Sequence, residues 1–479
     1  MAETIKKDKV GIKDFPKTYW VVIMFEFFER GSYYGMMSFL SVYLTNQLLF
    51  SKAEVGTIKG IIQPLLYLLP IFTGAIADKV GYRKTLLVAF SLLGAGYFLT
   101  SQVTEYTFVF ASLLIMAIGA GTFKPVVSGT IAKVTDERTS SLGFGIFYWV
   151  INLGAFLFPL ILVPALKAIN SAYVMIASAI FTGAMILPTL FLFKEPVAES
   201  TKKEPIGQVI IDILKKIWMV VLDWKFILFI FIYSIFWILY FQMFDTVLWY
   251  VNMFVDPTEL NNIISPVLNK LFGINWFFDV EHVTVINAGT IILLQLFISS
   301  IVKNTKALPT MLTGISFGII GMGILAISQS IWIFIAGIII FSIGEMTAHP
   351  KFISYLGMIA PRDKKATYMG FGFLYGVPSS LFGPIIGAWL YVLLVDNPMI
   401  DFIKSQLVGT GKSVLLAGDV SINKALEVAE SAGLSKSEIL QQAHTSELWL
   451  IFCGIGVLCI AGLLIYDKVI GTRTAEDVK

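Results

Sequence analysis

Long apolar segments recur along this chain, and each is long enough to cross a membrane. A bilayer core of about 30 Å needs roughly 20 apolar residues in a helix. The sequence predicts a polytopic, all-α membrane protein of twelve transmembrane helices, six on either side of a polar stretch. The segments lie near residues 19–47, 54–77, 84–102, 107–133, 140–165, 170–193, 226–254, 283–302, 308–328, 331–360, 366–395 and 447–467.

Composition supports this interpretation and argues against others. The chain is 57% hydrophobic and only 14% charged, whereas soluble globular proteins are about one quarter charged. A net charge of +3 is too small to indicate a nucleic-acid partner. Both cysteines, Cys453 and Cys459, lie in the last apolar segment, so we expect neither a disulfide framework nor a metal site. No nucleophile–base pair and no phosphate loop is visible, so we expect no enzyme and no cofactor.

Lysine and arginine gather in the loops on one side of the predicted membrane. The opposite loops hold little beyond Lys52, Lys167 and Lys270. Basic loops are typically cytoplasmic, so we expect a multi-pass protein of the cell membrane, embedded in the lipid bilayer, with both termini in the cytoplasm. The basic side carries Lys6, Lys7, Lys9, Lys13, Lys17, Lys79, Arg83, Lys84, Lys133, Arg138, Lys194, Lys202, Lys203, Lys215, Lys216, Lys225, Lys303, Lys306, Arg362, Lys364 and Lys365.

The order of the segments predicts two six-helix bundles. This six-plus-six pattern resembles the build of major facilitator transporters, whose halves surround a central cavity. Within the linker, residues 206–222 have the spacing of an amphipathic interfacial helix. In the second of two extracellular excursions, residues 425–432 and 435–442 are candidate helices. The predicted parts are a cytoplasmic tail at 1–18, an N-terminal bundle at 19–193, a cytoplasmic linker at 194–225, a C-terminal bundle at 226–467 with excursions at 255–282 and 396–446, and a cytoplasmic tail at 468–479.

The loop at residues 74–84 lies between the second and third segments and resembles the signature loop of the major facilitator superfamily. Gly81 permits a tight turn, and Asp78 is expected to cap a neighbouring helix N-terminus. Arg83 is expected to anchor the cytoplasmic face. We therefore predict a cytoplasmic gate at Asp78 and Arg83, with an ordinary basic loop as the alternative.

A few charged or titratable side chains fall inside the predicted membrane. An ionised group there costs roughly 2.5–3.5 kcal/mol on insertion scales, so it must be paired, hydrated or functional. Lys59, by contrast, is expected near the outer surface in contact with water, about 28 Å along the helix from Asp78. The intramembrane residues are Glu26, Glu29, Arg30, Lys124, Asp245, Glu345, His349 and Lys351.

Glu26, Glu29 and Arg30 are spaced at i, i+3 and i+4, so they project from one helical face. One guanidinium cannot satisfy two carboxylates. We expect one carboxyl to take a proton near neutral pH, because low dielectric and a like charge both disfavour ionisation. That proton would free Arg30 for another anion. A structural ion triad that holds the first segment to the fourth explains the spacing equally well.

Residues 26–35 resemble the ExxERFxYYG motif of the proton-dependent oligopeptide transporter family, with Gly31 in place of the usual Phe. The resemblance is strong across the first five segments and moderate in the second half, and its specific parts are the first motif and the INLG run at 151–154. The remaining runs resemble GxGxxKPN at 119–126, FYxxINxGS at 147–155, FWxxxxQ at 236–242 and GEL…SP…AP at 344–361.

This resemblance implies a symporter that imports di- and tripeptides, driven by a proton gradient. Glu26 and Glu29, with Arg30, would couple protons. Arg30 and Lys124 would hold the carboxylate of the peptide, and Glu345 would receive its amino terminus. The implied hydrogen-bonding and aromatic lining of the pocket consists of Tyr33, Tyr34, Tyr67, Asn152, Trp237 and Asn287.

Several positions depart from the family pattern. Phe241 stands where an acidic residue is usual, and Asp245, one turn later, is a candidate substitute. His349 and Lys351 are possible additions to the site, and Lys351 could pair with Glu345 or Asp245. Substrates therefore stay open: another small anion or zwitterion, such as an amino-acid conjugate or nitrate, is an alternative, as is a peptide sensor without transport. The sequence leaves the oligomeric state unknown, and a monomer is our expectation.

Overall fold

The computed structural model describes residues 11–196, 205–273, 275–361, 364–410, 412–416, 418 and 420–471. The outermost parts of both predicted tails, and Lys6, Lys7, Lys9, Lys202, Lys203 and Arg362 of the predicted basic side, lie outside these residues. Contacts divide the chain into two compact units. Unit 1 comprises Met1–Met36 and Leu65–Lys215, and unit 2 comprises Met37–Pro64 and Lys216–Lys479. The predicted bundle limits at 193 and 226 stay a prediction, since the units group residues by contact rather than by chain order.

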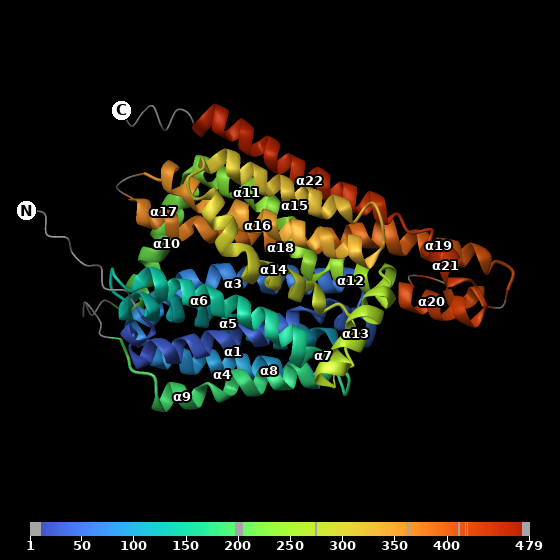
Figure 1. The fold of residues 1–479 in the computed structure, drawn as a ribbon, viewed down its shortest axis with the longest axis horizontal. Coiled ribbons are helices and arrows are strands. Elements are labelled where there is room, and N and C mark those ends of the chain that lie inside the picture. The colour runs from blue at the N-terminus through green and yellow to red at the C-terminus, as the bar shows by residue number, and fades with distance from the viewer. Residues whose placement is uncertain are drawn as a thin grey trace, which may run out of the picture. The chain divides into compact units, whose positions relative to one another are not determined.

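The described residues are almost entirely helical (Figure 1). They contain no strand, only an isolated bridge between Asp256 and Ser330. Helices α1, α3 and α10 pass from one unit to the other. The helices of unit 1, with these three, are η1 Ile12–Asp14, α1 Lys17–Met37, α3 Lys52–Val80, α4 Tyr82–Gln102, α5 Tyr106–Val134, α6 Ser140–Leu157, η3 Phe158–Leu162, α7 Val163–Lys167, α8 Ala172–Ala184, α9 Ile186–Phe191 and α10 Ile206–Leu222.

Unit 2 contains the remaining helices, and its α19, α20 and α21 lie together beyond the ends of α18 and α22 (Figure 1). These helices are α2 Leu40–Val42, η2 Tyr43–Gln47, α11 Trp224–Phe241, η4 Gln242–Phe244, α12 Thr246–Phe254, α13 Thr258–Phe272, α14 His282–Val302, α15 Ala307–Ile324, α16 Ile331–Ile359, α17 Lys365–Phe371, η6 Gly372–Tyr375, α18 Gly376–Tyr391, η7 Val392–Asp396, α19 Asn397–Gln406, η8 Ser413–Leu416, α20 Ile422–Ser431, α21 Lys436–Leu440, α22 Thr445–Tyr466 and η9 Asp467–Gly471.

Eleven helical segments among the described residues are long and apolar enough to cross a membrane. The twelfth predicted segment is α1, whose charged residues place it outside that criterion. These eleven segments are Lys52–Val80, Tyr82–Gln102, Tyr106–Val134, Ser140–Lys167, Ala172–Phe191, Trp224–Phe254, His282–Val302, Ala307–Ile324, Ile331–Ile359, Thr367–Gln406 and Lys436–Ile470. The predicted all-α polytopic fold is therefore confirmed.

Charged side chains of α1 are buried in the protein, and apolar side chains of α14 are exposed, which is the arrangement that a bilayer requires. In α1, Glu26, Glu29 and Arg30 are all buried in the protein. On α14, Leu293 and Leu296 are 79% and 85% exposed. Hydrocarbon accepts exposed leucine but penalises charge, so the charged face of α1 is turned inward and the leucine face of α14 suits lipid.

Shorter predicted elements are also confirmed. Helix α10 forms at residues 206–222 of the linker, the range predicted for a helix. In the second excursion, α20 and α21 form close to the predicted ranges. The first excursion contains a helix that was not predicted, α13.

Glycines let the most closely packed helices of unit 2 approach each other. A Cβ added to Gly314 of α15 would lie 2.5 Å from the backbone nitrogen of Ala348 and 2.8 Å from the carbonyl oxygen of Gly344, both in α16. Small residues at such crossings are how membrane helices gain packing contacts in the absence of a hydrophobic driving force. The contact between α15 and α16 therefore depends on a missing side chain.

A buried ion pair is among the contacts that join residues 37–64 to the rest of unit 2. Lys59 of α3 pairs with Asp245, which follows η4, and its Nζ donates to the Phe244 carbonyl oxygen at 2.7 Å. The Ser41 hydroxyl donates to Asp245 Oδ1 at 2.6 Å. Lys59 has 0% of its surface exposed. The expectation that Lys59 is solvated is therefore wrong. The position of a residue along its own helix does not reveal an ion-pair partner that comes from another helix.

We predict that Gly314→Ala lowers the thermal stability of the protein. The added methyl group would force α15 and α16 apart, and overpacking of this kind costs about 1–3 kcal/mol. The matched control is Gly454→Ala in α22, where an added Cβ meets nothing within 4 Å. The control should be neutral or gain up to about 1 kcal/mol from helix propensity. Thermal unfolding in one detergent compares them, and equal midpoints would contradict the prediction.

We also predict that Lys59→Met destabilises the protein more than the double variant Lys59→Met, Asp245→Asn. Loss of one partner leaves a buried charge unpaired, which costs about 3–5 kcal/mol, whereas loss of both leaves none. Thermal unfolding of the single and double variants checks this. A double variant that is as unstable as the sum of the two singles would show that the charges do not interact.

Candidate functional site

Arg30 is held by two carboxylates of its own helix in unit 1. Its Nε and Nη2 donate to Oε2 and Oε1 of Glu29 at 2.5 and 2.6 Å. Glu26 Oε1 lies 3.7 Å from the same Nε. Bidentate bonds of this type are among the strongest that a guanidinium forms. The predicted sharing is therefore present, but it is unequal: Glu29 has the paired geometry, and Glu26 is within ion-pair distance only.

Lys124 of α5 offers a second cation in unit 1. Its Nζ lies 5.4 Å from the ring centroid of Tyr67. No carboxylate oxygen among the described residues lies within 4 Å of that nitrogen. In the same unit, the Arg30 guanidinium carbon lies 5.1 Å from the ring centroid of Tyr33, which packs edge-on against Tyr34. The Lys124 ammonium therefore contacts an aromatic face, while Glu26 and Glu29 act on it only from beyond ion-pair distance.

Asn152, another predicted site residue of unit 1, forms a hydrogen bond within its own helix. Its Nδ2 donates to the carbonyl oxygen of Tyr148, one turn earlier in α6, at 2.9 Å. This contact ties the amide to its own helix, and its carbonyl oxygen retains the capacity to accept a bond. The geometry is compatible with the predicted lining role without testing it.

Glu345 of α16 is the corresponding acid in unit 2. Asn287 Nδ2 donates to Glu345 Oε2 at 3.2 Å and to the Ser342 hydroxyl oxygen at 2.9 Å. Within the part of the chain that is described, Glu345 has no lysine or arginine nitrogen within 4 Å. The structure thus brings Asn287 and Glu345 together, as the resemblance implies, and leaves this carboxyl without a cation.

Two of the possible additional residues are engaged elsewhere. Lys351 Nζ donates to the Thr305 carbonyl oxygen at 2.7 Å, and Asp245 pairs with Lys59. Lys351 therefore pairs with neither Glu345 nor Asp245. The sequence left open an ion pair between Lys351 and Glu345, and the structure does not contain that pair.

An aromatic cluster surrounds Trp237 in unit 2. Its ring centroid lies 4.8 Å from Tyr240, 4.9 Å from Tyr375 and 5.4 Å from His349. Trp237 Nε1 and His349 Nδ1 are buried without a hydrogen-bond partner among the described residues. His349 therefore belongs to an aromatic wall and not to an ion pair with Glu345.

The signature loop between α3 and α4 closes with a residue that the sequence interpretation missed. Asp78 accepts from Lys133 Nζ at 2.7 Å and from the Tyr82 hydroxyl at 2.8 Å. Glu195, not Asp78, accepts the backbone N–H groups of Tyr82 and Arg83 at the start of α4. The expectation that Asp78 caps a helix is wrong, because its carboxylate has nearer partners in its own unit.

Two further details complete this loop. Gly81 has a φ of +102°, which favours glycine. Arg83 Nε donates to the carbonyl oxygen of Thr189 in α9, at 3.1 Å, which ties the start of α4 to α9, and its predicted role at the cytoplasmic face stays a prediction. The sequence feature that could have identified Glu195 is its position, because it is an acidic residue just after the sixth predicted segment.

No group of three or more histidine, cysteine, aspartate or glutamate side chains among the described residues is arranged to hold a metal ion.

Residues 22–255 match the sequence profile of the Major Facilitator Superfamily. A curated relative, dipeptide and tripeptide permease B of Photorhabdus asymbiotica, is 30% identical over 165 residues, which is 34% of this chain and 34% of that protein. Other matches from Photorhabdus luminescens and Aliivibrio fischeri carry the same name. The chain spans about a third of the length of the curated relatives it matches.

Solved structures show the fold. A crystal structure of a mutant of the peptide transporter POT in complex with sulfate has a TM-score of 0.68 at 18% identity, covering 91% of this chain and 97% of that one. A nucleoside transporter has a TM-score of 0.67 at 14% identity, covering 94% and 99%. Two such neighbours with different cargo share one architecture, so the fold alone does not identify a substrate.

These matches agree with the sequence motifs described above and with the number and length of the apolar helices. The chain is a multi-pass membrane protein with the major facilitator fold, and its predicted resemblance to the proton-dependent oligopeptide transporters is confirmed.

Proposed function

We propose that this protein is a proton-coupled symporter that imports di- and tripeptides across the inner membrane by alternating access. One observation carries the proposal: each unit contains a charge without an ionic partner among the described residues, a cation at Lys124 in unit 1 and a carboxyl at Glu345 in unit 2. A zwitterionic peptide needs both. The permease names of its relatives support the same substrate class.

The cationic pole consists of Lys124 with Arg30. An unpaired ammonium in a membrane protein is costly, so a function is the better account of Lys124 than stability. Arg30 adds a planar guanidinium suited to two carboxylate oxygens. Tyr33, Tyr34, Tyr67 and Asn152 supply hydrogen-bonding groups beside this pole.

The anionic pole consists of Glu345, held by Asn287. When ionised, it would receive the ammonium group of the peptide. Trp237 and its aromatic neighbours would accept an apolar side chain. We assign no direct role to His349, Lys351 or Asp245, because each is engaged elsewhere.

Proton coupling follows from the unequal sharing of Arg30. While Glu29 is ionised, it occupies the Nε–Nη2 edge of the guanidinium, one of the two edges that a substrate carboxylate could use. A proton on Glu29 would weaken that pair and release Arg30, while Glu26 at 3.7 Å would balance part of the charge. The proton gradient is then the driving force, and no cofactor is needed.

Further parts of the proposal are a cytoplasmic gate at Asp78 and Arg83, both termini in the cytoplasm, and a monomer as the working unit. Among alternatives, a transporter of another zwitterion fits both poles, whereas nitrate would leave Glu345 without a role. A peptide sensor would bind at the same poles without net transport.

We predict that Glu29→Gln abolishes accumulation of labelled Ala-Ala in proteoliposomes with an imposed inward proton gradient, yet keeps counterflow exchange. The amide cannot cycle a proton, so the gradient loses its link to Arg30. The coupling proposal would be contradicted if uptake by the wild type did not depend on the proton gradient and Glu29→Gln behaved like the wild type. Wild-type uptake with no competition from any di- or tripeptide would end the peptide assignment alone.

We further predict that Lys124→Met raises the half-saturating concentration of Ala-Ala by at least tenfold, and that it narrows the preference for Ala-Ala over Ala-Ala-amide. Loss of one charge-assisted contact is worth about 1.5–3 kcal/mol. The control is Lys216→Met, which removes an exposed lysine of α10. Competition in the same uptake assay measures both, and an unchanged preference for the free carboxylate in Lys124→Met would contradict the role.

A further inference from the structure

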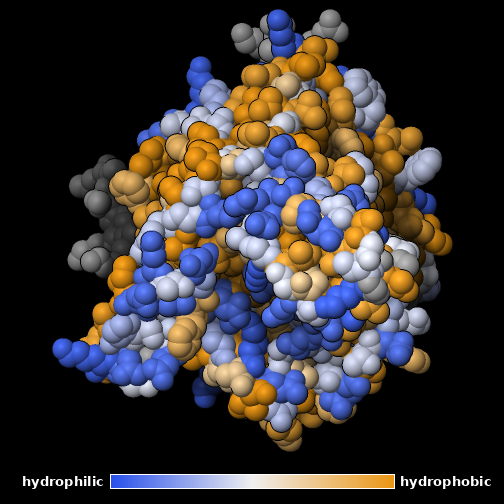
Figure 2. Space-filling view, turned by 90° about the vertical axis from the view of Figure 1, so that its right-hand side faces the viewer, coloured by the Kyte–Doolittle hydropathy of each residue, from blue (hydrophilic) through white to orange (hydrophobic). Residues whose placement is uncertain are grey.

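Unit 2 contains a cavity of about 380 Å³ that none of the proposed transport residues lines. Its walls come from η2, the start of α3, α12, the end of α18 with η7, and the start of α20. It lies at the end of the unit where α19–α21 project. Figure 2 views that end and shows hydrophilic side chains across much of it, so water and small solutes have a polar approach.

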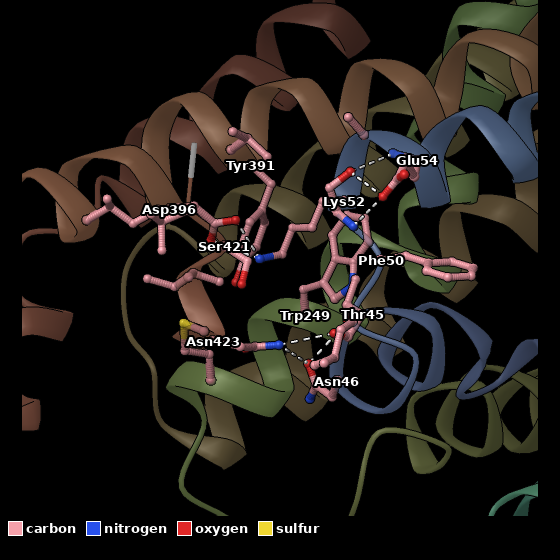
Figure 3. Close-up of a pocket in the computed structure, with 18 of the residues that line it drawn as sticks. Thr45, Asn46, Phe50, Lys52, Glu54, Trp249, Tyr391, Asp396, Ser421 and Asn423 are labelled. Carbon is pink, nitrogen blue, oxygen red and sulfur yellow. Dashed lines mark hydrogen bonds and ion pairs between the residues drawn. The ribbon is translucent and has the colours of Figure 1, made fainter. Parts of the chain in front are cut away.

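A buried ion pair lies in the wall of this cavity. Lys52 Nζ donates to Asp396 Oδ2 at 2.6 Å and to Oδ1 at 2.9 Å. The same nitrogen lies 4.6 Å from the ring centroid of Tyr391 and 5.6 Å from that of Trp249. The ammonium group of Lys52 thus occupies a cage of one carboxylate and two aromatic faces (Figure 3). Such a cage binds ammonium groups in general, by charge and by cation–π attraction.

Amide groups surround the cage. Asn423, at the start of α20, donates to the carbonyl oxygen of Thr45 at 3.1 Å (Figure 3). Asn46 donates to Asn252 Oδ1 at 3.0 Å. Helix α20 is therefore fastened over one wall by hydrogen bonds that can re-form with a ligand. A cavity of this size, with a few convergent polar groups, lies within the usual range for small-molecule sites.

Stability alone is a weak account of the Lys52–Asp396 pair. Buried ion pairs often contribute little net stability, because desolvation offsets the attraction. Helix α3 is already fixed against α18 nearby, where a Cβ on Gly56 or Gly60 would lie 2.8 Å from a backbone oxygen of α18. The Lys59–Asp245 pair, two turns along α3, does not line the cavity. The Lys52–Asp396 pair thus differs from the Lys59–Asp245 pair in that both of its residues line the cavity.

We propose that this cavity is a second binding site, for a small zwitterion, in which the ligand separates Lys52 from Asp396. The ammonium group of the ligand would take the place of Lys52 beside Asp396, Tyr391 and Trp249, and its carboxylate would pair with Lys52. Both buried charges keep a partner throughout the exchange. The identity of the zwitterion as a peptide rests on the proposed function, whereas the exchange of partners does not.

The test is the number of labelled Ala-Ala molecules bound by the purified full-length protein in detergent, measured by equilibrium dialysis. We expect two per chain in the wild type and one in Asp396→Asn. The matched control, Asp245→Asn, removes the equivalent charge of the pair outside the cavity and should still bind two. N-acetyl-Ala-Ala, which lacks the ammonium group, should not compete at the Asp396-dependent site. One molecule per chain in both the wild type and Asp396→Asn would overturn the inference.

A second measurement needs no variant. A dipeptide that carries a diazirine side chain is photo-crosslinked to the wild-type protein, and the labelled fragments are identified by mass spectrometry. Label near residues 46–54, 249–253 or 420–423 supports the site, and label confined to fragments with Arg30, Lys124 or Glu345 overturns it.

Failure of the two proposals can be told apart. Binding that depends on Asp396 but persists in Arg30→Ala, in a protein without peptide uptake, would keep this site and end the transport proposal. Uptake that depends on Arg30, with Asp396→Asn unchanged in stoichiometry, would do the reverse.

Discussion

A charge inside a bilayer must have a partner, and this constraint organises the structure. Unit 1 meets it with the bidentate Glu29–Arg30 pair of α1. Unit 2 meets it with Lys59 and Asp245, which join α3 to the break between η4 and α12. Against this background, the ammonium of Lys124 is conspicuous, because it faces an aromatic ring and no acid within 4 Å among the described residues. Charges left unsatisfied by the fold are the ones a substrate can satisfy.

Packing and chemistry are divided between different residues. Where helices must approach closely, as α15 and α16 do at Gly314, the chain removes side chains and relies on backbone contact. At Glu345 of α16, by contrast, a neighbouring amide donates to the carboxyl group, and no lysine or arginine nitrogen among the described residues lies within 4 Å of it.

The sequence predicted much of this fold, because apolar length and helical spacing are local properties. The twelve segments, α10 and the two excursion helices α20 and α21 all follow from them. The shared face of Glu26, Glu29 and Arg30 is equally local, since i, i+3 and i+4 positions meet on any helix.

Tertiary partners could not be predicted in the same way. Lys59 finds Asp245 at a separation of 186 residues, and no local pattern encodes that contact. Glu195 was overlooked because it lies in the polar linker, although it satisfies the backbone at the start of α4. The Lys52–Asp396 cage spans 344 residues and joins the start of α3 to the end of η7, a contact that no local pattern encodes.

The central claim is that a proton determines how the carboxyls of α1 share Arg30. The most direct measurement is the infrared difference spectrum of the purified protein between acidic and neutral pH, which records carboxyl groups as they gain a proton. The account predicts a protonated-carboxyl band that is lost in Glu26→Gln or in Glu29→Gln and that changes when Ala-Ala binds. A spectrum that is identical in the wild type and in both variants would contradict it.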